Sequence, residues 1–269
     1  MQEFSKGSAG NTLVFPFTQQ SINSLTPSSL ASPRVGAMHG VQLPTEFSDL
    51  QPWAEEIERV RSEVSRDEFP RWFMDKYFPA TWGVFPDSIP GPLKDERLSF
   101  YNPKGLANVV HMDNPLDLGK AIHAWLLRNN YRPILSTTTG HVEFLDNVCE
   151  AMRIMTNYVT DALDKSFAVK YYYGVARPEE VLSYNMTYYS EGCPTHPSFP
   201  AGHGAAAGGT AKYFLDYFDL DSDAIFVVRT SAYIWAMARS LAGVHYAQDN
   251  LAGLWVGGLN DVTYRGFTI

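Results

Sequence analysis

The chain has 269 residues, of which 45% are hydrophobic, so it is long enough to bury a sizeable core as one large domain or two small ones. Its 21 basic and 29 acidic residues leave a formal net charge of −8, and a surface this acidic would repel nucleic acid and anionic membranes, which excludes both as partners. No run approaches the ~18 apolar residues of a membrane span, and residues 1–10 lack the basic start and apolar stretch of a signal peptide, so we expect a soluble protein, with its compartment and any homo-oligomer left open.

The first part of the chain differs in composition from the rest. Residues 1–48 are rich in Ser, Thr, Gly, Pro and Gln and show no sustained period, which predicts an extended N-terminal arm. From residue 49 to residue 269 we expect a single helical domain. Its first helix follows Trp53, where apolar residues recur at intervals of three and four, at Ile57, Val60 and Val64. A second helix is expected near Glu68.

The middle of the chain contains the two clearest helix signals. Asn114 followed by Pro115 predicts a helix start, because proline is well tolerated at the first helical position. We expect the most regular helix after Gly140, where one apolar stripe continues for about five turns. That stripe consists of Phe144, Leu145, Val148, Met152, Met155, Val159 and Leu163.

The last third predicts a loop and two further helices. Three prolines make residues 190–202 a loop, and small residues dominate a predicted helix over residues 204–218. Ser222 is a candidate N-cap for the next helix, which runs to Arg239. No segment shows the alternation of a strand, so the predicted fold class is all-α.

Three short stretches contain the candidate functional residues. They are residues 170–178, residues 200–203 and residues 239–249. Together they supply Lys170, Arg177, Gly202, His203, Arg239, His245 and Asp249.

The cations and the glycine of these stretches suit a small tetrahedral oxyanion such as phosphate or vanadate. The planar fork of arginine matches two oxygens at once, and lysine adds a point charge. Backbone amides near a glycine add donors without bulk. We therefore expect oxyanion contacts from Lys170, Arg177, Gly202 and Arg239.

The histidines suit the chemistry at the central atom of such an anion. A neutral imidazole can attack or ligate that atom along the axis, provided that its second nitrogen is held. His245 lies four residues before Asp249, so a shared helical turn would let the carboxylate hold that N–H group. His203 follows the Pro-Ala-Gly turn and can act as general acid–base. Each residue alone also has an ordinary structural explanation, and only the ordered combination is specific.

The order Lys-x6-Arg-Pro, Pro-x-Gly-His and Arg-x5-His-x3-Asp resembles the signature of the vanadium-dependent haloperoxidases and the type 2 phosphatidic acid phosphatases. The motif-bearing resemblance covers roughly residues 140–255. It implies a helical bundle of the haloperoxidase and acid phosphatase type, with the oxyanion site within residues 165–250. It also implies His245 as ligand to vanadium or as phosphate-accepting nucleophile, His203 as acid–base group, and Asp249 as partner of His245.

Finer features resemble the bromoperoxidases within this superfamily. Arg177 is followed by Pro-Glu, and residues 196–200 read His-Pro-Ser-Phe-Pro, similar to the bromoperoxidase run His-Pro-Ser-Tyr-Pro. His196 would be a second active-site histidine. The resemblance therefore implies vanadate as cofactor, with hydrogen peroxide, bromide or iodide, and small organic acceptors as partners in the reaction.

Two positions depart from the family pattern. Ala201 stands where the family has a serine, and loss of that hydrogen bond to a charged ligand should cost about 1.5–3 kcal/mol, or roughly ten- to a hundredfold in affinity. Phe167 stands where tryptophan is frequent, so the halide preference stays open.

Two other functions remain open. The first is a soluble acid phosphatase that uses His245 as nucleophile and His203 to protonate the leaving group. The second is a degenerate oxyanion-binding protein with little turnover, for which Ala201 is the only support.

Overall fold

The computed structural model describes residues 114–136, 142–144, 148–182 and 194–259, with short pieces at 3–5, 12–14, 263–264 and 267–268 and parts of 51–58. The principal helices of this part are α7 (Pro115–Arg128), α8 (Val148–Tyr173), α9 (Pro178–Leu182), α10 (Gly202–Tyr217), α11 (Ser222–Leu241) and α12 (Ala247–Val256). The fold class is all-α, as predicted. No helix in the described ranges has the length and hydropathy needed to cross a membrane.

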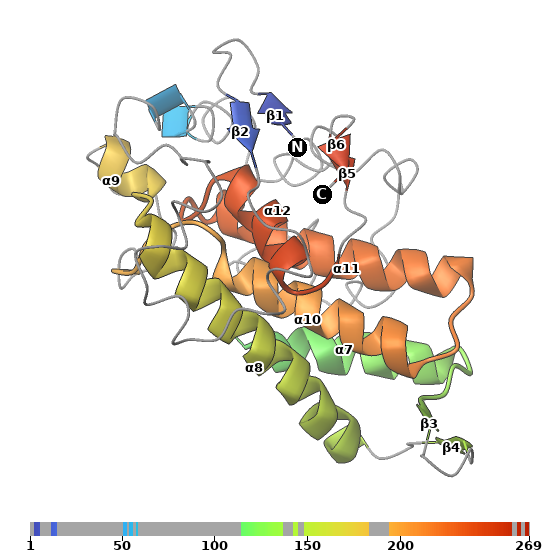
Figure 1. Ribbon diagram of the computed structural model, residues 1–269. Helices are drawn as coiled ribbons and strands as arrows, with labels where there is room; N and C mark the ends of the chain where they lie inside the picture. The colour runs from blue at the N-terminus through green and yellow to red at the C-terminus, as the bar shows by residue number, and fades with distance from the viewer. Residues whose placement is uncertain are drawn as a thin grey trace.

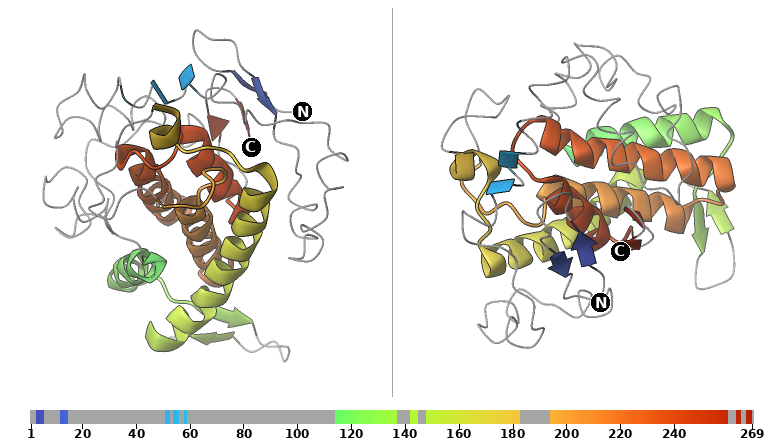
Figure 2. Two further views of the ribbon diagram at one scale, coloured as in Figure 1. Left: turned by 90° about the vertical axis from the view of Figure 1, so that its left-hand side faces the viewer. Right: turned by 90° about the horizontal axis from the view of Figure 1, so that it is seen from above.

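The helix α10 lies at the centre of the bundle. It packs against α8, α11, α12 and α7, and Figures 1 and 2 show α8 and α11 on opposite sides of it. Eleven of its 16 residues are buried, and eight of these eleven are glycine or alanine. Because such side chains are short, the neighbouring helices can approach the α10 backbone closely.

The expected N-terminal arm is described only at β1 (Glu3–Ser5) and β2 (Thr12–Val14), which pair antiparallel. Of the helix expected after Trp53, helical backbone is described at residues 54, 55 and 58, and Ala54 is fully buried. The rest of both segments lies outside the described residues, and so do the helix expected near Glu68 and the apolar residues Ile57, Val60 and Val64. The division into an arm and a single domain stays a prediction.

The predicted start of α7 is confirmed. Asn114 is the N-cap and its side chain accepts a hydrogen bond from the Leu116 amide at 3.0 Å, with Pro115 at the first helical position. The buried face of this helix carries Leu118, Ile122 and Leu126. The cap and the spacing of these apolar residues are local signals, which is why the sequence alone could predict this helix.

The predicted start of α8 was wrong, as was the expectation of no strands. The helix begins at Val148, whereas Phe144 lies in β4 (Val142–Phe144), paired antiparallel with β3 (Ile134–Ser136). Three residues of alternating side chains cannot be told from a helix start by periodicity, because a short apolar run fits both periods. A third short hairpin joins β5 (Thr263–Tyr264) to β6 (Phe267–Thr268).

The predicted cap of α11 was displaced by one residue. The N-cap is Asp221, whose carboxylate accepts from the Ala224 amide at 2.9 Å, and Ser222 is the first helical residue. The same carboxylate accepts from the Tyr131 hydroxyl at 2.7 Å. An aspartate caps as well as a serine and adds a negative charge at the positive end of the helix.

The contact between α10 and α12 is a contact of backbone on backbone. A Cβ atom built on Gly204 would lie 2.6 Å from the carbonyl oxygen of Asn250, and one on Gly253 would lie 2.9 Å from the Ala205 amide nitrogen. Gly208 and Gly257 are equally enclosed one turn further on. Glycine is therefore required at these positions for the observed separation of the two helices.

Replacement of Gly253 by alanine should push α12 away from α10. We expect Gly253→Ala to lower the free energy of unfolding by about 1–3 kcal/mol, because the added methyl group meets only backbone atoms. Urea denaturation of the full chain measures the change. The control is Gly119→Ala, whose Cβ would meet the flexible side chains of Met155 and Met152 rather than backbone, and which should be tolerated. Equal stability losses in the two variants would contradict this account of the contact.

Candidate active site

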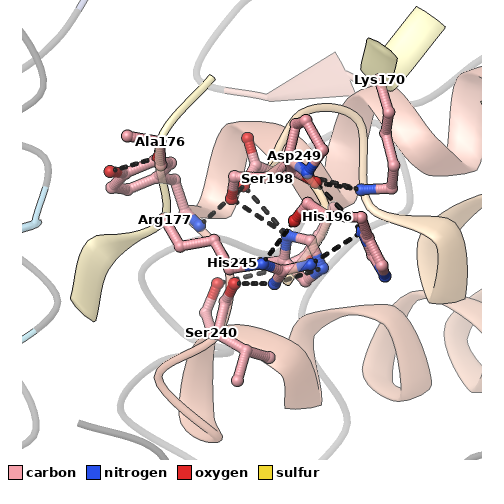
Figure 3. A network of polar contacts seen from close by, with 12 residues as sticks. Lys170, Ala176, Arg177, His196, Ser198, Ser240, His245 and Asp249 are labelled. Atoms are coloured by element: carbon pink, nitrogen blue, oxygen red, sulfur yellow. Dashed lines mark hydrogen bonds and ion pairs between the residues drawn. The ribbon is translucent and has the colours of Figure 1, made fainter. Parts of the chain in front are cut away.

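The site lies where the end of α8, the start of α10, the end of α11 and the start of α12 meet. The Ala201 amide before α10 donates to the carbonyl oxygen of Asp249 in α12 at 2.8 Å, which joins the two helix starts directly. Figure 3 shows the polar side chains that converge there. The three stretches singled out in the sequence are thus brought together by the packing of helices around α10.

Lys170 is fully buried in the last turn of α8. Its ammonium group donates to the carbonyl oxygens of Pro197 at 2.9 Å and Ser198 at 2.8 Å. The pKa of Lys170 is lowered to about 7, mainly by burial and also by the charge of the nearby Arg177, while the charge of Asp249 acts in the opposite direction. An ammonium group has three N–H donors, so one remains beyond the two carbonyl contacts.

Arg177 is also buried, in the segment between α8 and α9. Its Nε donates to the His196 carbonyl oxygen at 2.9 Å and its Nη1 donates to the Val244 carbonyl oxygen at 2.6 Å. Nη1 also lies 3.5 Å from Nε2 of His245, and Nη2 lies 3.1 Å from Nδ1 of His196. The guanidinium group therefore joins the two histidines.

His245 and Asp249 lie side by side, although His245 precedes α12 and only Asp249 belongs to it. The His245 Nδ1 atom is 3.1 Å from Oδ2 of Asp249, and the same oxygen accepts from the Tyr246 amide at 3.0 Å. Asp249 therefore acts within the first turn of α12, where it accepts from the backbone and faces the ring at once. This geometry replaces the single helical turn that the spacing had suggested.

The pKa of His245 lies well below its usual value. Burial is the largest cause, and the surrounding cationic or basic side chains add to it: Arg177, Lys170, His203 and Arg239. The ring is therefore neutral near pH 7, and its contact with Asp249 is a hydrogen bond rather than an ion pair. Burial raises the pKa of Asp249 to about 6, against the lowering effect of a hydrogen bond from Ser198.

His203 and Arg239 lie close to each other, and the charges of both lower the pKa of His245. His203 lies in the first turn of α10, and its Nε2 is 3.5 Å from Nη1 of the buried Arg239 in the last turn of α11. The His203 ring also lies 5.3 Å from the Trp235 ring, centroid to centroid. Gly202 is the first residue of α10, and a Cβ atom on it would be 4.0 Å from Cε of Lys170.

Ala201 is the N-cap of α10 and is fully buried. Its methyl side chain makes no capping hydrogen bond, so the first turn of α10 lacks the side-chain acceptor that a serine would supply. The departure from the family pattern noted in the sequence therefore lies at a helix start that faces the site.

His196 is half-buried at the edge of the site. Its ring packs edge-on against Phe167 with centroids 5.2 Å apart. Burial lowers the pKa of His196, and the charges of Lys170 and Arg177 lower it further. His196 is therefore also neutral near pH 7.

Sequence reasoning assigned no role to Ser198, and the structure places it inside the site. Its hydroxyl group donates to Oδ2 of Asp249 at 2.5 Å and lies 3.3 Å from Nδ1 of His245. The only sequence signal was its place in the His-Pro-Ser segment that carries His196. No spacing rule connects a loop serine with a carboxylate 51 residues later.

Anion binding should weaken as the pH rises above about 7, because the anion-free protein then loses the charge of Lys170. A bound anion raises the pKa of this amine, so binding takes up a proton there, and affinity falls by up to about tenfold per pH unit. Calorimetric titration with phosphate from about pH 6 to about pH 9 measures the effect.

Lys170→Arg is the matched control, because arginine keeps its charge throughout this range. The protonation of phosphate itself affects both affinities equally, so it does not change the ratio of the affinity of the unmodified protein to that of Lys170→Arg. A ratio that does not change with pH would contradict the role of Lys170.

Comparison with known proteins bears on this region. Residues 149–264 match the family model of the PAP2 superfamily, and this range contains all the candidate site residues from Lys170 to Asp249. The match supports the superfamily that the motifs indicated. No curated protein sequence matches the chain.

Among solved structures, the chain is similar to one described as the first bacterial vanadium-dependent iodoperoxidase. The two share 16% sequence identity and a TM-score of 0.41, and the alignment covers 77% of this chain and 46% of that one. The chain thus spans less than half the length of that protein.

Proposed function

We propose that the protein is a vanadate-dependent haloperoxidase, in which hydrogen peroxide oxidises bromide or iodide to the hypohalous acid and is itself reduced to water. The observation that carries this proposal is the position of His196, whose ring contacts Arg177 beside the neutral His245. A second histidine at that place distinguishes the bromoperoxidase pattern in the sequence. Bound vanadate would supply the activation of peroxide and the transfer of oxygen to the halide.

The side chains of the site fit vanadate on chemical grounds. Lys170, Arg177 and Arg239 are buried cations around one carboxylate, and their charges lower the pKa of His245, so an anion among them would be stabilised. His245 would bind the vanadium through Nε2, and the Gly202 amide would add a donor. Within the described residues, no three His, Cys, Asp or Glu side chains gather as ligands of a simple cation. The His245 imidazole together with oxyanion donors is the set that would hold vanadate here.

The remaining side chains would handle protons and position the reactants. His203 would take a proton from peroxide and return it to the departing oxygen, and the adjacent Arg239 would hold that ring in place. Asp249 would keep the proton of His245 on Nδ1, away from the anion. The edge-on contact of His196 with Phe167 would orient the second histidine toward the site.

The purified full chain, reconstituted with vanadate, should oxidise bromide or iodide when peroxide is added. We expect His245→Ala to reduce the rate at least about a hundredfold, because it removes the imidazole that would hold the vanadate in this proposal. The rate of triiodide formation or of bromination of an organic acceptor is the measurement.

His123→Leu is the matched control for this experiment. His123 is buried against the rings of Phe214 in α10 and of Phe218, the residue that follows this helix, and neither of its ring nitrogens has a hydrogen-bond partner. This variant should retain the rate. No halide oxidation by the unmodified protein between about pH 5 and about pH 9 would refute the proposal.

A phosphatase is the second candidate, favoured by the match to the PAP2 superfamily. Nε2 of His245 would attack the phosphorus atom, His203 would protonate the leaving oxygen, and water would then release phosphate from the imidazole. Vanadate separates the two functions, because it should activate a peroxidase and inhibit a phosphatase. Phosphate release from a generic ester, measured with and without vanadate, therefore decides between them.

Ala201→Ser should increase the affinity for vanadate about ten- to a hundredfold, because it restores a hydrogen bond to a charged ligand. The same hydroxyl group should also cap α10 and stabilise the anion-free fold by about 1 kcal/mol. Calorimetric titration measures the first effect and denaturation without anion measures the second.

Ala201→Gly provides the control, since glycine also caps helices but offers no hydroxyl group to the ligand. If only the serine variant turns over halide, the unmodified chain is a degenerate oxyanion-binding protein. Turnover by the unmodified chain would exclude that third function.

A further inference from the structure

Ser198 is buried, and hydrogen bonds to both its backbone amide and its carbonyl oxygen fix its position. The residue is fully buried, its amide donates to the Val175 carbonyl oxygen at 2.7 Å, and its carbonyl oxygen accepts from Lys170 at 2.8 Å. Its hydroxyl group therefore has little freedom to leave Asp249 and His245. Figure 3 shows the three side chains together.

The proton of each group in this contact can be assigned. The Ser198 hydroxyl has one proton, and it donates this proton in the 2.5 Å hydrogen bond to Oδ2 of Asp249. Its oxygen then offers only lone pairs to Nδ1 of His245 at 3.3 Å. Oδ2 of Asp249, at 3.1 Å from Nδ1, is also an acceptor. Facing two acceptors, Nδ1 must carry the proton of the neutral ring.

The other ring nitrogen faces a donor. Nη1 of Arg177 lies 3.5 Å from Nε2 of His245, and a guanidinium group has no acceptor to offer. Nε2 is therefore the nitrogen that keeps its lone pair. It is also the nitrogen that either proposed function requires for bonding to vanadium or phosphorus.

The carboxylate of Asp249 depends on few contacts for its orientation. Oδ1 is buried without a hydrogen-bond partner, so the described contacts all involve Oδ2. Oδ2 accepts from Ser198, from the Tyr246 amide and from His245. Without the serine hydroxyl, the carboxylate would lose its shortest contact and Nδ1 would lose one of its two acceptors.

We propose that Ser198 is a positioning residue that holds Asp249 and fixes the proton of His245 on Nδ1, so that Nε2 can bond to the oxyanion. The role rests on the proposed function only in that Nε2 is the reacting atom. It is the same for a haloperoxidase and for a phosphatase. Because the Ser198 hydroxyl group donates its proton to Asp249, it does not replace the hydroxyl group missing at Ala201.

The experiment measures the tautomer of His245 directly in the full chain without anion. Nitrogen-15 NMR of histidine-labelled protein near about pH 8 distinguishes a protonated Nδ1 from a protonated Nε2, and the spectrum of His245→Gln identifies the signals. We expect Nδ1–H in the unmodified protein and a mixture of both tautomers in Ser198→Ala. We also expect vanadate to bind about ten- to a hundredfold more weakly to Ser198→Ala, as for other residues that orient a ligating histidine.

Ser166→Ala is the matched control, since Ser166 is a fully buried serine of α8 whose hydroxyl has no hydrogen-bond partner. It should leave the tautomer and the vanadate affinity unchanged. A protonated Nε2 in the unmodified protein would overturn the proposal even if Ser198→Ala failed to fold. An unchanged tautomer in a folded Ser198→Ala would overturn it too. A shifted tautomer without halide oxidation or phosphate release by the unmodified protein would leave Ser198 in its role and refute the proposed function.

Discussion

The close approach of α10 and α12 is the contact on which the site depends. Gly204 and Gly253 let the two backbones touch, and this contact places Ala201 within hydrogen-bond distance of Asp249. The start of α10 carries His203 and the start of α12 carries Asp249, so the distance between the helices determines the distance between His203 and the pair formed by His245 and Asp249. The packing of these two helices therefore determines the geometry of the site.

Charge is the second constraint. Three basic side chains, Lys170, Arg177 and Arg239, are buried in the same region as the carboxylate of Asp249, and burial alone would disfavour so much charge there. Backbone carbonyl oxygens from residues 196–198 and from Val244 accept from two of them and offset part of that cost. The lowered pKa values of Lys170 and His245 show that the offset is incomplete. A negatively charged ligand, as in the proposed function, would offset the remaining cost.

Local signals in the sequence predicted some elements well and others not at all. Asn114 and Pro115 defined the start of α7 because a cap and a helix-starting proline act within a few residues. Phe144 was assigned to a helix because three residues do not reveal a period, and it lies in a hairpin. Motif order singled out basic residues and histidines that the fold brings together, and their roles stay a prediction. It could not locate Ser198, whose contact with Asp249 arises only from the fold.

The backbone of residues 196–198 serves several site residues at once. It accepts hydrogen bonds from Lys170 and Arg177, and it donates one to Val175. Any local opening of this segment would break the anchors of both cations and withdraw the Ser198 hydroxyl in a single event. The site therefore belongs to one cooperative unfolding unit, and its amide protons should exchange with solvent together rather than residue by residue.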